Sequence, residues 1–176
     1  FSKLIEKKNP SHISEIVSFF WMGRGTLTDK GKIKPLWKVL YEIALQNLDN
    51  LEYKRIISDL SKWLSLIDEI DDATFEWLMT SAKYVEFNHN ASTFIECLLA
   101  HVDKMPEKVG KLYLEMLDSE TYPYYEKEDI GKLVQKLYET GQKEVADRIC
   151  NKYGEKGDHF DFLRGMYEKY KSVKND

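Results

Sequence analysis

The sequence predicts an all-α fold of about nine helices that pair into antiparallel hairpins. Apolar residues recur at intervals of three and four in one segment after another, which is the spacing of a helix with a buried face. No segment alternates between apolar and polar residues as a half-exposed strand would. Helix starts are expected near residues 11, 34, 53, 72, 91, 107, 127, 142 and 158. Two consecutive helices therefore occupy roughly 35 to 40 residues, a unit length found in arrays of helical hairpins.

The first three predicted helices occupy residues 11–22, 34–48 and 53–67. Ser11 is expected to cap the first helix, and the glycines that follow the helix end it. Thr28 or Lys34 is expected to cap the second helix, with Pro35 in its first turn. A turn at residues 47–50 separates the second helix from the third.

The central stretch, residues 73–102, predicts two helices with apolar residues on most of their circumference. An ordinary surface helix has an apolar stripe only about 100° wide, so both helices are expected to have neighbours on two sides. Asp72 is the expected N-cap of the first helix and Asn90 that of the second. We expect Trp77 and Leu98 to be buried between neighbouring hairpins.

The remaining four helices are expected to begin near residues 107, 127, 142 and 158. Pro106 suits the first turn of one, and Gly141 and Gly154 end two others. The longest connector is residues 122–125, which carry three tyrosines.

The spacing favours an open, right-handed solenoid of stacked hairpins over a closed bundle, because bundles use fewer and longer helices with narrower apolar seams. We expect residues 1–176 to form a single domain. The sequence begins with Phe1 rather than Met, so we expect this domain to be a fragment of a longer protein.

Residues 130–153 resemble a tetratricopeptide helical hairpin. The residues that keep the large and small spacing of that family are Leu133, Leu137, Gly141, Ala146 and Cys150. Val134 stands where the family often has Gly, and the rest of the chain looks more like irregular HEAT-type helix pairs. The resemblance implies a scaffold that binds other proteins.

Residues 19–25, Phe-Phe-Trp-Met-Gly-Arg-Gly, followed by Leu27 and Thr28, carry a second resemblance. They are similar to C-terminal helical regions of large bacterial proteins that carry a sirtuin-like or nucleotide-hydrolysing domain upstream. This resemblance implies that the chemistry lies in another domain and that these helices sense or assemble.

Composition narrows the class of protein. The 176 residues are 43% hydrophobic and 32% charged, which is far from a disordered composition. The net charge of −4 argues against a dedicated nucleic-acid binder, which usually carries a basic excess. Two cysteines without a CxxC pair favour the reducing cytoplasm, and no apolar run is long enough to span a membrane.

Glu96, Cys97 and His101 are the main candidates for metal chemistry. Cys97 and His101 stand four residues apart and share one helix face, as two metal ligands would. A zinc site needs three or four ligands, and the sequence offers no second pair. We interpret the two side chains as structural and expect no metal, no cofactor and no catalytic residue.

Residues 23–26, Gly-Arg-Gly-Thr, and the lysines after them contain the elements of a phosphate-binding loop. They lack the GK[ST] ending and a preceding strand, so we interpret them as a helix-breaking turn. Lys30, Lys32, Lys34 and Lys38 around Trp37 could form a nucleic-acid patch with a stacking ring. The helical spacing instead favours Trp37 as a core residue with a rim of solvated lysines.

The sequence therefore predicts a non-catalytic module that binds a protein or peptide and has the option of self-association. The candidate contact residues are Tyr122, Tyr124, Tyr125 and Trp37, because rigid aromatic side chains anchor partners when they are exposed. One alternative is the regulatory or oligomerising segment of an enzyme whose catalytic domain lies outside this chain. A third interpretation is nucleic-acid binding through residues 30–38.

Overall fold

The computed structural model describes residues 9–26, 30–85 and 89–172. These residues form nine α-helices, four short 3-10 helices and no strand, so the predicted all-α class is confirmed. The α-helices are α2 (Pro10–Met22), α3 (Ile33–Leu45), α4 (Leu51–Ser61), α5 (Asp72–Ala82), α6 (His89–His101), α7 (Pro106–Asp118), α8 (Lys127–Glu139), α9 (Lys143–Gly154) and α10 (Arg164–Lys171). The 3-10 helices are η1 (Arg24–Thr26), η2 (Lys30–Lys32), η3 (Lys62–Leu66) and η4 (Asp158–Leu163).

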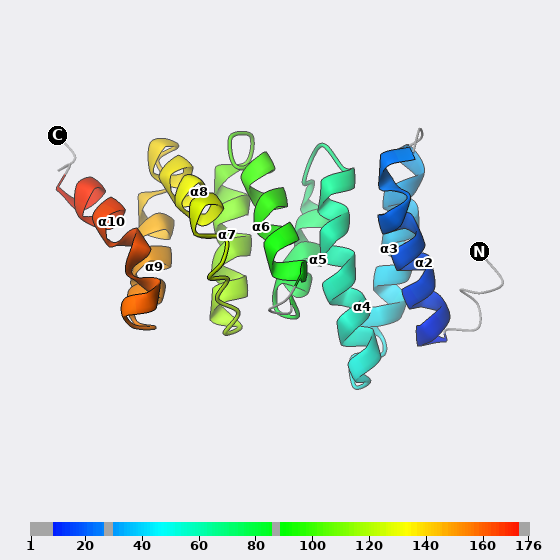
Figure 1. Cartoon of the computed structure of the whole chain (residues 1–176). Coiled ribbons are helices and arrows are strands. Elements are labelled where there is room, and N and C mark those ends of the chain that lie inside the picture. The colour runs from blue at the N-terminus through cyan, green and yellow to red at the C-terminus, as the bar shows by residue number, and fades with distance from the viewer. Residues whose placement is uncertain (1–8, 27–29, 86–88, 173–176) are drawn as a thin grey trace.

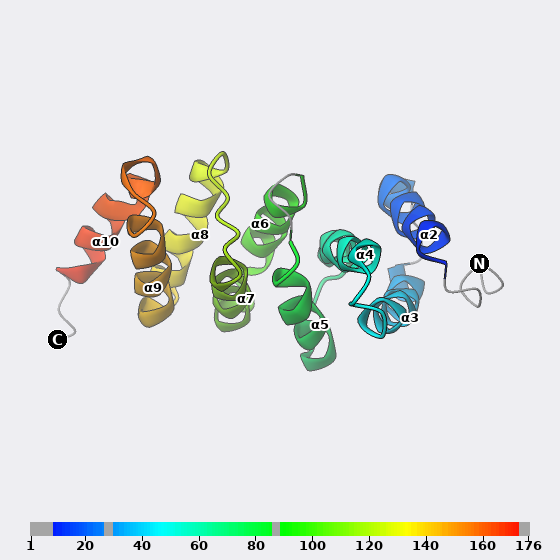
Figure 2. The ribbon, with the colours of Figure 1, turned by 90° about the horizontal axis from the view of Figure 1, so that it is seen from below.

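The helices follow one another along a single row, with α2 at one end and α10 at the other (Figure 1). Figure 2 shows two layers in this row. We call α2, α4, α6 and α8 the even layer, and α3, α5, α7 and α9 the odd layer. Helices pack on sequence neighbours in the other layer, as α3 does on α4, and on the next helix of their own layer, as α5 does on α7.

The core runs along the row between the two layers. Helices α2 to α9 each contribute apolar residues to this core, which removes these side chains from water. The largest fully buried side chains are Trp37, Trp63, Tyr41, Tyr113, Tyr153 and Phe94, which come from both halves of the chain. The core is therefore continuous rather than centred on one pair of helices.

Two predicted N-caps are wrong by one or two residues. Asn9, not Ser11, caps α2, and its side-chain oxygen accepts a hydrogen bond from the Ser11 N–H. Asp71, not Asp72, caps α5, and its carboxylate accepts from the Thr74 N–H at 2.8 Å. In both cases the capping residue has the extended backbone that precedes a first turn, whereas its rival is already within that turn.

The other two predicted caps also need correction. Lys34 lies within the first turn of α3, which has Lys32 at the N-cap position without a side-chain cap, and Thr28 lies outside the described residues. Asn90 lies inside α6 and does not cap it. Its amide donates instead to the Ser58 hydroxyl at 2.8 Å and to the Asp59 carboxylate at 3.1 Å, so it ties α6 to α4.

Two predicted helices are divided. The helix predicted at residues 53–67 continues beyond α4 as the 3-10 helix η3. Here the hydroxyls of Ser61 and Ser65 donate to carbonyls three residues earlier. Such short side-chain bonds compete with the α-helical pattern. The helix predicted to start near residue 158 begins as the 3-10 helix η4. The α-helix α10 starts only at Arg164, six residues later than predicted.

The structure confirms one predicted burial in the central stretch and corrects the other. Leu98 is fully buried. Trp77 is only partly buried, and its ring packs against Trp37 and Tyr41, with ring centroids 5.7 and 5.9 Å away. Trp77 therefore joins α5 to α3 rather than filling the centre of the core.

Candidate functional site

The structure separates the four aromatic residues predicted to contact a partner. Trp37 and Tyr122 are buried, so they are packing residues and leave the list of candidates. Tyr124 is half-buried, and the Lys127 ammonium lies 4.0 Å from its ring centroid and donates to its hydroxyl. Tyr125 is 93% exposed and presents its ring to solvent. The connector alone thus offers one exposed anchor, not three.

In the described part of the basic stretch after η1, two of the lysines lie close to carboxylates. Lys34 pairs with Asp71, and Lys38 lies 3.8 Å from a Glu42 carboxylate oxygen. The side chain of Lys30 lies outside the described residues. With Trp37 buried, this stretch lacks the stacking ring that single-stranded nucleic acid requires.

The Gly-Arg-Gly-Thr segment is a helix-ending turn. The Gly23 N–H donates to the Phe19 carbonyl at 2.9 Å, and the Thr26 N–H and hydroxyl both donate to the Gly23 carbonyl. These donors are used within the turn, so they do not converge on a phosphate.

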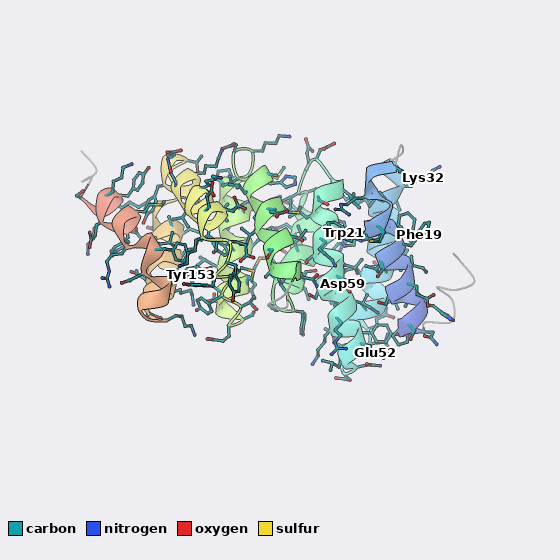
Figure 3. All side chains as sticks on the ribbon, in the orientation of Figure 1. Phe19, Trp21, Lys32, Glu52, Asp59 and Tyr153 are labelled. Carbon is teal, nitrogen blue, oxygen red and sulfur yellow. The ribbon has the colours of Figure 1, made fainter. Side chains whose placement is uncertain are left out.

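A hollow of about 430 Å³ lies among α2, η1, η3 and α6, and we call it the η3 cleft. Its lining brings together two stretches that the sequence analysis treated separately. Trp21 and Arg24 come from the end of α2 and from η1, and Glu96, Cys97 and His101 come from α6. Figure 3 shows Trp21 on the side of α2 that faces α4, consistent with the 5.6 Å between its ring centroid and the Lys62 ammonium of η3.

Two of the residues that line the η3 cleft, Cys97 and His101, are buried and uncharged. Burial raises the pKa of the Cys97 thiol to about 12, and the Glu96 charge acts in the same direction. Cys97 is therefore a protonated thiol near neutral pH rather than a nucleophilic thiolate. Burial also lowers the pKa of His101, which favours the neutral ring. The Nδ1 atom of His101 is buried without a hydrogen-bond partner.

The rim of the η3 cleft is charged. Glu96 and Asp68 line it, and among the described residues neither carboxylate takes part in an ion pair. The Arg24 guanidinium lies 4.0 Å from the Trp21 ring centroid and donates to the Trp21 carbonyl at 2.9 Å. The site therefore combines an aromatic wall, one cation and two unpaired carboxylates.

The residues predicted as metal candidates do not form a metal centre in this arrangement. In the part of the chain that the structure describes, no three His, Cys, Asp or Glu side chains come close enough together to hold a metal ion. The protonated Cys97 thiol would also have to lose its proton before it could bind zinc.

Sequence reasoning missed Asp68 as a site residue. It lies in the acidic segment after η3, where it looks like an ordinary loop carboxylate, and no local pattern links it to residues 21–24 or 93–101. Only the packing of α2 and α6 against α4 and η3 places these segments together.

A scan against models of known protein families gave no match to this chain, and searches of curated proteins and of solved structures gave none either. Among the described residues, every helix is too short or too polar to cross a bilayer.

Proposed function

We propose that this protein is a non-catalytic helical-repeat module that binds a protein or peptide partner on its even layer. We further propose that the row of helices is an open, right-handed solenoid of the tetratricopeptide or HEAT kind. The packing of each helix on its nearest neighbours supports this proposal, because stacked hairpins leave a long face exposed on each layer.

The way in which charges are paired on the two layers carries the proposal. In the odd layer, ion pairs join successive helices and so neutralise charges across the face. These pairs are Lys34 with Asp71, Lys108 with Asp72, Lys83 with Glu115, and Lys152 with Asp118. A partner on this face would have to compete with pairs that already exist.

The even layer also has an ion pair between successive helices, Lys136 of α8 with Asp103 after α6, but it leaves other charges unpaired. It contains the η3 cleft, whose exposed Glu96 and Asp68 carboxylates lack an ion pair among the described residues. Charged groups without an ion pair gain more from an oppositely charged ligand than charged groups that are already paired. A partner is therefore expected to bind where the cleft opens.

The test is the selection of peptides from a random display library on the immobilised protein, followed by affinity measurements in solution. Glu96→Lys changes the even layer, and Glu76→Lys makes the same change at an exposed glutamate of α5 in the odd layer. We expect enriched peptides to bind the wild type and Glu76→Lys but not Glu96→Lys. Failure to enrich any binding peptide would contradict the proposed function, and equal binding to all three proteins would place the partner elsewhere.

A second candidate function, assembly as the oligomerising segment of a larger enzyme, is favoured by the outer side of α2. Phe19 and Met22 are 64% and 80% exposed there, and Figure 3 shows Phe19 on the side away from the row. Light scattering across a range of concentrations tests this role. A dimer that Phe19→Ser and Met22→Ser dissociate would support it, whereas a monomer at every concentration would exclude self-association through this face.

We also propose a reducing compartment such as the cytoplasm. Cys97 and Cys150 are both free and buried, which supports this location because oxidising compartments favour disulfides.

A further inference from the structure

We propose that α10 is a releasable cap at the end of the row, held closed by Tyr170, and that its release controls access to the face of α8 and α9 that it covers. In the open state α10 leaves this face and unfolds, while η4 stays in place. None of the residues involved lines the η3 cleft, so this device does not depend on the partner proposed there.

Helix α10 is the most weakly packed α-helix of the described chain. Figures 1 and 2 show it at the end of the row, where it contacts α9. Every other α-helix contributes several buried side chains to the core, whereas α10 contributes none. With only eight residues, α10 is also too short to be stable in water as an isolated helix. Its helical structure therefore depends on its contacts with the rest of the protein.

Two hollows lie along the interface between α10 and the preceding helices. One of about 380 Å³ is lined by Cys150 of α9 and by Arg164 and Tyr167 of α10, among others. The other, of about 560 Å³, is lined by Tyr138 of α8, by the start of α9 and by Tyr170 of α10. Side chains that face a hollow lack part of the dispersion attraction of a close-packed core. The separation of α10 from the row therefore costs less than the separation of a core helix.

Tyr170 makes all of the ring stacking and hydrogen bonding that joins α10 to α8 and α9 among the described residues. Its ring stacks on the Tyr138 ring of α8, with centroids 4.3 Å apart and ring planes 4° apart. Its carbonyl accepts a hydrogen bond from the Lys143 ammonium of α9 at 3.2 Å. This bond places a cation at the last turn of α10, where carbonyl groups lack partners within the helix. Loss of the Tyr170 side chain should therefore release the cap.

The hinge of the cap lies between η4 and α10. Leu163 ends η4 and is 1% exposed, and the Phe162 ring lies 5.3 Å from the buried Tyr153 ring, so η4 is anchored in the core. Gly165 lies in the first turn of α10, is exposed, and weakens the helix relative to alanine. The anchored and the releasable segments therefore meet at Arg164.

Release of α10 would uncover Tyr138 and Cys150, which are each 7% exposed while the cap is closed. The Cys150 Sγ lies 3.8 Å from the Tyr138 hydroxyl and faces the same hollow as Tyr167 of α10. Burial raises the pKa of the Cys150 thiol to about 11, so the closed protein holds little reactive thiolate at this position. The rate at which Cys150 is modified therefore reports the population of the open state.

The experiment measures the rates at which N-ethylmaleimide, at low concentration, modifies Cys97 and Cys150 in the same protein. Digestion and mass spectrometry distinguish the two cysteines. Cys97 is buried in α6, away from α10, so it reports unfolding of the whole protein. Tyr170→Ala removes the stacked ring, and Tyr170→Phe is its control because it keeps the ring. Gly165→Ala strengthens α10, and Gly131→Ala in α8 is its control, because a Cβ atom at either glycine would meet nothing within 4 Å.

We expect Tyr170→Ala to raise the rate at Cys150 at least about tenfold and to leave the rate at Cys97 unchanged, whereas Tyr170→Phe should change neither rate. Gly165→Ala should lower the rate at Cys150 about fivefold, because it makes α10 a better helix, and Gly131→Ala should leave this rate unchanged. An unchanged rate at Cys150 in Tyr170→Ala, or an equal acceleration at both cysteines, would overturn the inference. A rate at Cys150 that Gly165→Ala does not lower would also overturn it.

Discussion

The hydroxyl groups of Tyr113 on α7 and Tyr153 on α9 lie 2.7 Å apart in the interior. Tyr153, labelled in Figure 3, also donates its single hydroxyl proton to the Pro123 carbonyl at 3.0 Å. Tyr113 must therefore be the donor between the two tyrosines. Both rings are fully buried, so this chain of two hydrogen bonds attaches the connector before α8 to the interface of α7 and α9.

The direction of donation in these two hydrogen bonds predicts unequal effects of two conservative substitutions. Tyr113→Phe removes one hydrogen bond and leaves only an empty acceptor site on Tyr153, which should cost about 1 kcal/mol. Tyr153→Phe removes both bonds and leaves the Tyr113 hydroxyl and the Pro123 carbonyl unpaired, which should cost about 2–4 kcal/mol. Urea unfolding of both variants measures the difference. Equal losses would contradict the assigned direction of donation.

Buried tyrosines also predict a loss of stability in alkaline solution. Burial raises the pKa of Tyr41 to about 12, and burial likewise raises the pKa values of Tyr113 and Tyr153 above the ordinary value of 10.0. Their contribution to stability is fully present below pH 10 and is lost as the pH rises toward the folded-state values, because the unfolded chain releases these protons first. Each such tyrosine should cost up to about 1.4 kcal/mol per pH unit above 10.

Thermal unfolding at several pH values, followed together with tyrosinate absorbance, measures this effect. Tyr41→Phe should reduce the slope of stability against pH above 10. An unchanged slope would show that Tyr41 does not contribute to the loss.

The fold could be predicted to the level of helices because each helix carries its own apolar period. The exact starts were less predictable, because polar residues that can cap occur close together, as Asn9 and Ser11 or Asp71 and Asp72 do. The choice between them depends on where the extended backbone ends, which no residue type encodes alone. The 3-10 geometry of η3 depends on hydroxyl bonds that the apolar pattern does not reveal.

The candidate site was harder to predict, because its parts are distant in the sequence. Trp21, Asp68 and His101 meet only because α2 and α6 pack on α4 and η3, and periodicity gives no information on the offset between helices. Composition also did not show which tyrosines of the connector, residues 122–125, are buried and which are exposed. Tyr122 packs against the Tyr153 ring, whereas Tyr125 points to solvent, although both flank the same short turn.

Gly110 is predicted to be required for the close approach of α7 and α9. A Cβ atom at this position would lie 2.6 Å from Cγ1 of Val145, whose branched side chain is too stiff to move aside easily. Gly110→Ala should therefore destabilise the protein by about 1–3 kcal/mol through overpacking.

Gly131 in α8 is a matched control, because a Cβ atom there would meet nothing within 4 Å. Gly131→Ala should stabilise the protein by about 1 kcal/mol through helix propensity. Denaturant unfolding gives both values, and adding Val145→Ala to Gly110→Ala should restore part of the loss. Equal effects of the two alanine substitutions would contradict the steric argument.

Leu98 and Leu51 provide a matched pair for core packing. Leu98 of α6 is fully buried, so Leu98→Ala should cost about 2–5 kcal/mol. Leu51 begins α4 and is 60% exposed, so Leu51→Ala should change stability by less than about 0.5 kcal/mol. Trp77→Ala should fall between them, because it removes ring contacts with Trp37 and Tyr41 but keeps the backbone carbonyl that the Tyr41 hydroxyl donates to. A loss for Leu51→Ala as large as that for Leu98→Ala would contradict this ranking.

The lowered pKa of His101 predicts that the protein loses stability as the pH falls below neutral. Burial lowers its pKa below the ordinary 6.5; the nearby Lys104 charge adds to this effect, and the Asp68 carboxylate and the Leu64 backbone oppose it. The unfolded chain therefore takes up a proton at a higher pH than the folded protein does. The contribution of the neutral ring to stability is present above about pH 6.5 and is lost as the pH falls toward the folded-state pKa, by up to about 1.4 kcal/mol per pH unit.

His101→Gln cannot titrate, so the unfolding free energy of this variant should vary less than that of the wild type between about pH 7.5 and pH 5. Parallel curves for the two proteins would show that His101 is protonated equally in the folded and unfolded states.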